Sequence, residues 1–194
     1  MREQKQPYSD QNELENYRNL YTRFYKKLYN YGHKFTADAT LIEDSIQDIF
    51  LAYWKRKDTH LAPDAISSYL FSAFRYSLFK KIIRERRLTS LMVGEEEPDF
   101  SIDHFIIHRE TTQQVQQQVQ AALGQLTGRQ REALFLRFYE ALSYEEIAVV
   151  MNISVKASYK LMARSLLQLK NGLSLPVWLF LWELFSLFPD QRSP

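Results

Sequence analysis

Three positively charged residues near the end of the chain stand four positions apart: Lys156, Lys160 and Arg164. Residues spaced by four share one face of a helix, so these side chains form a single cationic stripe. A helix with such a stripe fits the major groove of duplex DNA, where Lys and Arg meet phosphates or guanine edges. The spacing alone also fits an amphipathic helical hairpin with a solvated basic face.

A second segment, residues 68–87, interleaves aromatic rings with cations. Cations follow a nucleic-acid backbone, and each base stacked on an aromatic ring contributes about 1–3 kcal/mol. A protein that opens a duplex needs both, because it must hold a strand and receive an unstacked base. The aromatics are Tyr69, Phe71, Phe74, Tyr76 and Phe79, and the cations are Arg75, Lys80, Lys81, Arg84, Arg86 and Arg87. For Tyr69, Phe74 and Leu78 we favour ordinary core packing.

A third set combines acidic and amide side chains with two aromatic rings: Glu43, Asp44, Gln47, Asp48, Phe50 and Trp54. A polar, acidic helix face beside an aromatic anchor is a reasonable protein interface. The alternatives are solvation with a helix-dipole benefit for the carboxylates and core packing for the rings. Acid–base chemistry is disfavoured, because no nucleophile or metal set accompanies the carboxylates.

Apolar periodicity predicts the three helices that must position the last two sets, over residues 14–31, 38–57 and 63–87. Pro63 can start the third, because its missing N–H is not needed in a first helical turn. Three helices of this length can form one small core.

Helical periodicity returns near Thr111 and predicts a second group of helices. Two capping boxes, Thr127 with Gln130 and Ser143 with Glu146, mark helix starts. Asn152 suits a left-handed turn, after which Ser154 caps a last helix over residues 155–171. Helix, short turn, helix is the helix-turn-helix pattern, and its second helix carries the cationic stripe. The sequence therefore predicts an all-α protein of two small domains.

The two groups are joined by an acidic stretch. Residues 94–99 read Gly-Glu-Glu-Glu-Pro-Asp, which predicts a solvated, flexible linker. The basic run before it, residues 75–88, and the acidic run that contains it, residues 88–112, indicate different partners for different segments.

Several functions are disfavoured by composition. The chain has no cysteine, which excludes disulfides and cysteine-ligated metals and fits a reducing cytoplasm. Its polar first ten residues do not make a signal peptide. His104 and His108 stand four apart, but no HExxH motif or third ligand accompanies them, so a metal site is disfavoured. We expect no cofactor, no small-molecule substrate and no enzymatic activity.

The segment 173–188 is strongly apolar, with Pro176 near its start. As a helix, residues 176–188 would span roughly 20 Å, too short for a bilayer core of about 30 Å. We expect it to fold back on one domain. It could alternatively shield a surface that binds DNA or a partner protein, dock a regulatory partner or touch a membrane surface.

Residues 123–170 closely resemble the fourth region of extracytoplasmic-function sigma factors. The matching features are Leu126 with Arg129 and Arg131, the helix start at residues 142–148 and the turn at Ile153 and Ser154. Ser158 departs from the usual apolar residue. The resemblance implies that this domain reads the −35 promoter element, through Lys156, Ala157, Tyr159, Lys160, Ala163 and Arg164.

Residues 42–57 resemble the second region of the same family, and all six members of the acidic and aromatic set match its signature. The resemblance implies that this helix docks on the clamp helices of the polymerase β′ subunit. It also implies that the next helix and the loop 58–64 recognise and melt the −10 element. The residues expected there are Tyr69, Arg75, Tyr76, Lys80, Lys81, Arg84 and Arg87. Tyr76 stands where many members of the family have Asn, a difference that affects which base would be preferred.

These features together predict four parts: a second-region domain over residues 10–88, a linker over 89–112, a helix-turn-helix domain over 113–171 and the apolar tail from 172. The expected function is promoter-directed transcription initiation, with core RNA polymerase, promoter DNA and an anti-sigma factor as partners. The alternative is a stand-alone helix-turn-helix regulator, although a repressor has no need of a clamp-binding helix.

Overall fold

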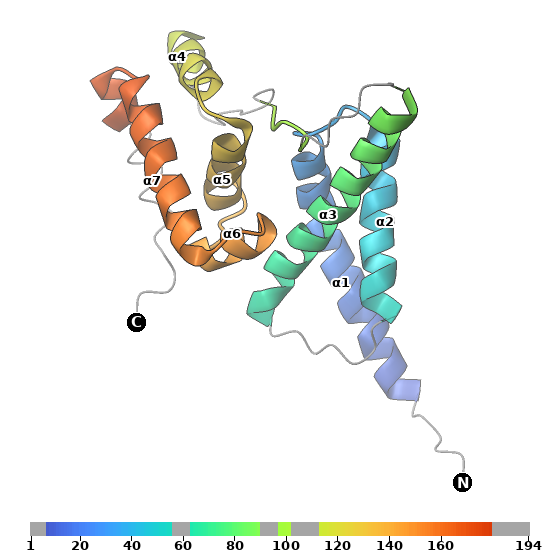
Figure 1. The fold of residues 1–194 in the computed structure, drawn as a ribbon. Helices are drawn as coiled ribbons and strands as arrows, with labels where there is room; N and C mark the ends of the chain where they lie inside the picture. The colour runs from blue at the N-terminus through green and yellow to red at the C-terminus, as the bar shows by residue number, and fades with distance from the viewer. Residues whose placement is uncertain (1–6, 56–62, 90–96, 102–112, 180–194) are drawn as a thin grey trace.

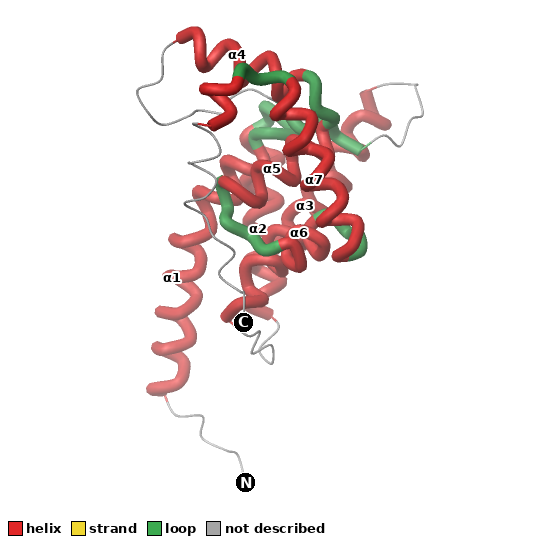
Figure 2. Tube along the Cα trace, turned by 90° about the vertical axis from the view of Figure 1, so that its left-hand side faces the viewer, coloured by secondary structure: helices red, strands yellow, loops and turns green. Residues whose placement is uncertain are grey.

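The computed structural model describes residues 7–55, 63–89, 97–101 and 113–179, and regular structure in these ranges is entirely helical. The first domain comprises α1 (Pro7–Gly32), α2 (Ala39–Lys55) and α3 (Pro63–Thr89). The second comprises α4 (Gln113–Gly124), α5 (Gly128–Phe138), α6 (Tyr144–Val150) and α7 (Val155–Asn171). Figure 1 shows the two groups side by side, and Figure 2 shows the first half of α1 projecting beyond the other helices. The all-α prediction is confirmed.

The first domain closes around the apolar faces that the sequence predicts. Ile42, Ile46 and Ile49 of α2 are buried together with Phe74 and Leu78 of α3. The end of α1 comes very close to both helices, since a Cβ on Gly32 would lie 2.9 Å from Ile42 Cγ2 and 2.9 Å from Phe74 Cζ. Only glycine fits there without a shift of its neighbours.

Local capping signals set the helix boundaries of the second domain. Thr127 and Ser143 each form a complete capping box at the starts of α5 and α6, and Ser154 caps α7. Asn152 has a φ of 51°, the left-handed turn expected between α6 and α7. Ala141, which the sequence did not single out, also adopts a positive φ, of 56°. The helix-turn-helix prediction is therefore confirmed in its details.

The start of the apolar tail folds back onto the second domain. Residues 175–179 are helical, Val177 is buried and Trp178 packs against the core. The Ser174 hydroxyl donates to Gln118 Oε1 of α4 at 3.0 Å. This agrees with the expected fold-back as far as Leu179, and the rest of the tail lies outside the described residues.

The two domains pack against each other, with α3 in contact with α6 (Figure 1). Phe100, which directly follows the acidic stretch, is 1% exposed and lies between them. Its ring centroid is 5.1 Å from Phe35, 6.3 Å from Tyr31 and 5.5 Å from Phe135. Within the predicted linker 89–112, the expectation of a solvated tether therefore does not hold at Phe100, although Glu97 and Asp99 are exposed. An aromatic ring gains more by burial than by exposure.

Candidate nucleic-acid interface

The cationic stripe of α7 lies on the surface. Lys156, Lys160 and Arg164 are all exposed, while Met162 and Leu169 on the other side of the helix are buried. Ser154 holds the N-terminus of α7 by accepting the backbone N–H of Ala157 at 3.2 Å. The geometry that DNA binding requires of this helix is therefore present, and base reading by these residues remains a prediction.

Tyr159 is the aromatic member of the same surface and is 47% exposed. Its ring lies 4.3 Å from that of Tyr144, and its hydroxyl donates to Glu145 at 3.4 Å. Ala163 is exposed and Ala157 half-buried. The contacts with α6 orient Tyr159, which is the kind of support that a contact residue needs.

Ser158 lies behind this surface and is 1% exposed. Its hydroxyl has no hydrogen-bond partner in the described part of the chain. Ser158 therefore buries a polar group in a position suited to an apolar residue, which lowers the stability of the folded state.

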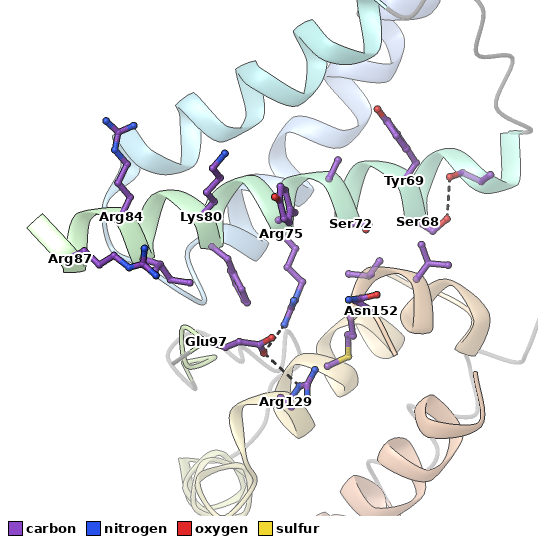
Figure 3. A pocket seen from close by; sticks show the side chains of 18 of the residues that line it. Ser68, Tyr69, Ser72, Arg75, Lys80, Arg84, Arg87, Glu97, Arg129 and Asn152 are labelled. Carbon is purple, nitrogen blue, oxygen red and sulfur yellow. Dashed lines mark hydrogen bonds and ion pairs between the residues drawn. The ribbon is translucent and has the colours of Figure 1, made fainter. Parts of the chain in front are cut away.

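The predicted −10 surface of α3 faces the second domain across a cleft of about 1340 Å³. Tyr69, Tyr76, Lys80, Arg84 and Arg87 line it from α3, and residues 149–152 line it from the end of α6. Figure 3 shows Arg75 reaching toward Glu97, while Lys80 and Arg84 extend upward in this view, away from Glu97. The cleft is bordered by cations on the side that the sequence assigns to DNA.

Arg75 is not available on this surface. Its side chain is buried, with Nε donating to Glu132 Oε1 at 2.7 Å and Nη2 donating to Glu132 Oε2 at 3.3 Å and to Glu97 at 3.2 Å. The Tyr31 hydroxyl donates to the same carboxylate at 2.6 Å. In this closed arrangement the expected DNA contact of Arg75 does not hold, because a carboxylate from α5 takes the place of a phosphate.

The protonation states in this cluster follow from burial and charge. Burial lowers the pKa of Arg75, but the charge and hydrogen bonds of Glu132, with Tyr31 and Glu97, raise it overall above its ordinary value. Burial and the Glu132 carboxylate raise the pKa of Tyr31 well above its ordinary value. Arg75 therefore stays charged and Tyr31 stays a neutral donor.

The other α3 residues differ in exposure. Tyr76 is 73% exposed, and Lys80, Arg84 and Arg87 are exposed. Tyr69 is half-buried beside Tyr53, which agrees in part with the favoured core interpretation. Lys81 pairs with Asp48 of α2 at 2.9 Å, a surface ion pair that water and salt weaken.

The polar face of α2 lies on the side of α3 away from the second domain (Figure 1). Glu43, Asp44, Gln47 and Asp48 are exposed, and Trp54 is 39% exposed with its ring 4.9 Å from Tyr17. Phe50 is only 1% exposed and packs on Tyr17 and Tyr21. The assignment of Phe50 to a partner surface is wrong in this structure, because its ring supports the face from inside.

The sequence did not indicate that two charged residues of α5, Arg131 and Glu132, join the domains. Glu132 binds Arg75, and Arg131 donates to the Phe100 carbonyl at 2.7 Å and to Asp99 at 2.9 Å. Both stand beside the apolar run that begins at Ala133, and both are buried. Charged residues at core positions of an amphipathic helix are the signal that could have revealed them.

The described residues contain no group of three or more His, Asp or Glu side chains that could hold a metal ion. His104 and His108 lie outside those residues. Among the helices described, none has the length and apolar character that crossing a membrane requires.

Comparison with known proteins finds a matching domain family and similar solved structures. Residues 116–169 match the family model described as Sigma-70, region 4. The fold is similar to that of the sigma factor RpoE from Bartonella quintana, solved in complex with the anti-sigma factor NepR. That likeness has a TM-score of 0.58 at 19% sequence identity and covers 82% of this chain and 98% of that one. No curated protein sequence matches the chain.

Proposed function

We propose that this chain, which carries a Sigma-70 region 4 domain within a sigma-factor fold, is a sigma factor of the extracytoplasmic-function type. It directs core RNA polymerase to promoters and supports initiation through contacts with the −35 and −10 elements. It performs no catalysis itself, and the polymerase supplies the chemistry.

The observation that carries this proposal is one exposed helix inside the matched domain. α7 lies within residues 116–169 except for its last two residues, and it presents Lys156, Lys160 and Arg164 to solvent. A capped helix at the end of a helix-turn-helix, with cations on its free face, is suited to the major groove. We assign it to the −35 element.

The first domain supplies the polymerase and −10 contacts. Glu43, Asp44, Gln47 and Asp48 form an open polar face on α2, with Trp54 beside them. The cations of α3 suit a nucleic-acid backbone, and Tyr76 offers an exposed ring for stacking. The α2 face supports this function over a stand-alone regulator, which would bind duplex DNA without a polymerase-docking surface.

Reconstitution with core RNA polymerase tests the proposal. The protein is added to core enzyme on genomic fragments, and the starts of the transcripts are mapped. We expect discrete start sites that share upstream elements and that core enzyme alone does not use. Absence of any start above the core-only background would exclude a sigma-factor function.

A charge reversal separates the two candidate functions. Asp44→Lys should lower affinity for core polymerase at least tenfold and abolish the mapped transcripts, with duplex binding unchanged. Glu15→Lys, an equal charge change on the exposed side of α1, is the control and should retain activity. If Asp44→Lys leaves polymerase binding intact, the docking role of α2 is wrong.

A further inference from the structure

We propose that an apolar row on α7, formed by Val155, Tyr159 and Ala163, contacts thymine methyl groups in the major groove, and that Tyr144 holds Tyr159 in position for this contact. The inference rests on the proposed function for duplex binding by α7, and it adds which base the helix prefers. It assigns part of the sequence preference to side chains beside the cations rather than to the cations alone.

The apolar row runs beside the cationic stripe. Val155, Tyr159 and Ala163 each precede one of the three cations by one position, and they too are spaced by four, so they share one side of the helix. All three are exposed, Val155 to 41% and Tyr159 to 47%. The outer surface of α7 therefore presents charged and apolar groups in two adjacent lines.

The place of the row on the helix indicates its ligand. The N-terminal part of a recognition helix contacts base edges in the major groove, and Val155 is the first residue of α7. At 1.5 Å per residue, Val155 and Ala163 lie about 12 Å apart along the helix axis, roughly the rise of three base pairs. The apolar group that a base edge offers there is the C5-methyl of thymine, which alanine and aromatic side chains contact.

Contacts with α6 fix the ring of Tyr159. Its centroid lies 4.3 Å from that of the Tyr144 ring, and its hydroxyl donates to Glu145 at 3.4 Å. Because the ring packs on Tyr144 and its hydroxyl donor is turned toward Glu145, the exposed part of the side chain is mainly ring carbon. A side chain held in this way loses little further conformational entropy when a ligand covers it.

Tyr144 is itself anchored, which makes it a positioning residue. The guanidinium carbon of Arg137 lies 5.0 Å from the centroid of the Tyr144 ring, and Nη1 of Arg137 donates to the Leu142 carbonyl at 3.0 Å. Tyr144 is half-buried and is the first residue of α6, directly after the Ser143 cap. The orientation of Tyr159 is thus tied to a capped helix start.

Uracil-containing DNA tests the row, because thymine and uracil differ only in the methyl group. The full chain selects duplexes from a random-sequence pool, and the selected duplex is made with thymine and with uracil throughout. We expect the uracil duplex to bind about fourfold more weakly for each methyl that the row covers. Tyr159→Ala should lower this ratio of affinities about fourfold, while Tyr159→Phe should keep it.

Matched variants separate methyl contact from folding and from charge. Tyr144→Ala should lower the ratio as well, and Tyr144→Phe should keep it, because only the ring supports Tyr159. Lys160→Ala should weaken binding to both duplexes equally. Leu175→Ala shortens an exposed apolar side chain beyond α7 and should change neither affinity. Circular dichroism checks that each variant keeps its helix content.

The methyl contact and the proposed function fail through different results. Equal binding of the thymine and uracil duplexes by the parent, or an unchanged ratio in Tyr159→Ala, would overturn the methyl contact and leave duplex recognition intact. A pool that yields no enriched duplex would overturn duplex recognition by α7, and the methyl contact with it.

Discussion

The two surfaces proposed to meet DNA differ in how they are presented. On α7 the cations are exposed and the contacts with α6 orient Tyr159 from behind. On α3 the cations line a cleft, and Arg75 is paired with the Glu132 carboxylate of the other domain. A recognition helix needs only its own domain to be ready, whereas a strand-opening surface has to be kept from indiscriminate binding. Under the proposed function, Arg75 has to leave Glu132 before it can meet a strand, whereas the α7 cations are already exposed.

The largest expected effect comes from removing the α7 stripe. Lys156, Lys160 and Arg164 all changed to Ala should lower affinity for duplex promoter DNA about 100-fold, at about 1 kcal/mol or more per side chain. The slope of log K against log salt, which is negative, should become shallower by about 2 to 3, since each lost phosphate contact removes about 0.9 from its magnitude. Fluorescence anisotropy across a salt series measures both.

The matched control for that triple variant lies on α3. Lys80, Arg84 and Arg87 changed to Ala should alter duplex binding by the free protein no more than about threefold, because the proposed duplex contacts lie on α7 and not on α3. The same variant should lose promoter opening by the holoenzyme. Equal losses of duplex binding in the two triple variants would remove the contrast between the surfaces.

A smaller effect concerns the second ion pair between the domains, Lys27 with Glu140 at 3.0 Å. Burial raises the pKa of Glu140 above its ordinary value of 4.5, although Lys27 opposes the shift. A carboxyl with a raised pKa favours the folded state in its protonated form, so its contribution to stability is lost as pH rises from 4.5 through the raised value. Glu140→Gln should remove this loss.

Thermal unfolding from about pH 4 to pH 7 measures that effect. The unfolding temperature of Glu140→Gln minus that of the parent should increase from about pH 4 to pH 7. A relative midpoint that falls with rising pH would mean that Glu140 and Lys27 hold the domains together by charge.

The smallest effect is inside α7. Ser158→Ala removes a buried hydroxyl without a described partner and should raise the free energy of unfolding by about 1 kcal/mol. Ser165→Ala is the control, because the Ser165 hydroxyl donates to the Leu161 carbonyl at 2.8 Å and should not give the same gain. Urea denaturation compares them, and equal shifts would show that Ser158 carries no special cost.

Local signals made most of the fold predictable. Thr127, Ser143 and Ser154 act within three residues of themselves, so the helix starts could be placed from the sequence. The apolar spacing of α2 likewise identified its buried face. The exposure of the α7 stripe followed from the same periodicity.

Contacts between distant residues were not predictable in the same way. Glu132 lies 57 positions from Arg75, and nothing near either residue indicates the other. Phe100 follows an acidic stretch typical of a linker, and its ring is buried only because the two domains pack around it. Phe50 and Trp54 are four apart on one helix, so their common spacing could not show that one is internal and the other exposed.

Burial of Phe100 has a thermodynamic consequence for any ligand that requires the two domains to be apart. A ring shared by both halves would be solvated again if they parted, so its burial lowers the fraction of molecules in which they are apart. A ligand that binds only molecules with separated domains would have its apparent dissociation constant multiplied by the inverse of that fraction. The affinity of such a ligand would thus depend on a side chain that the ligand itself does not touch.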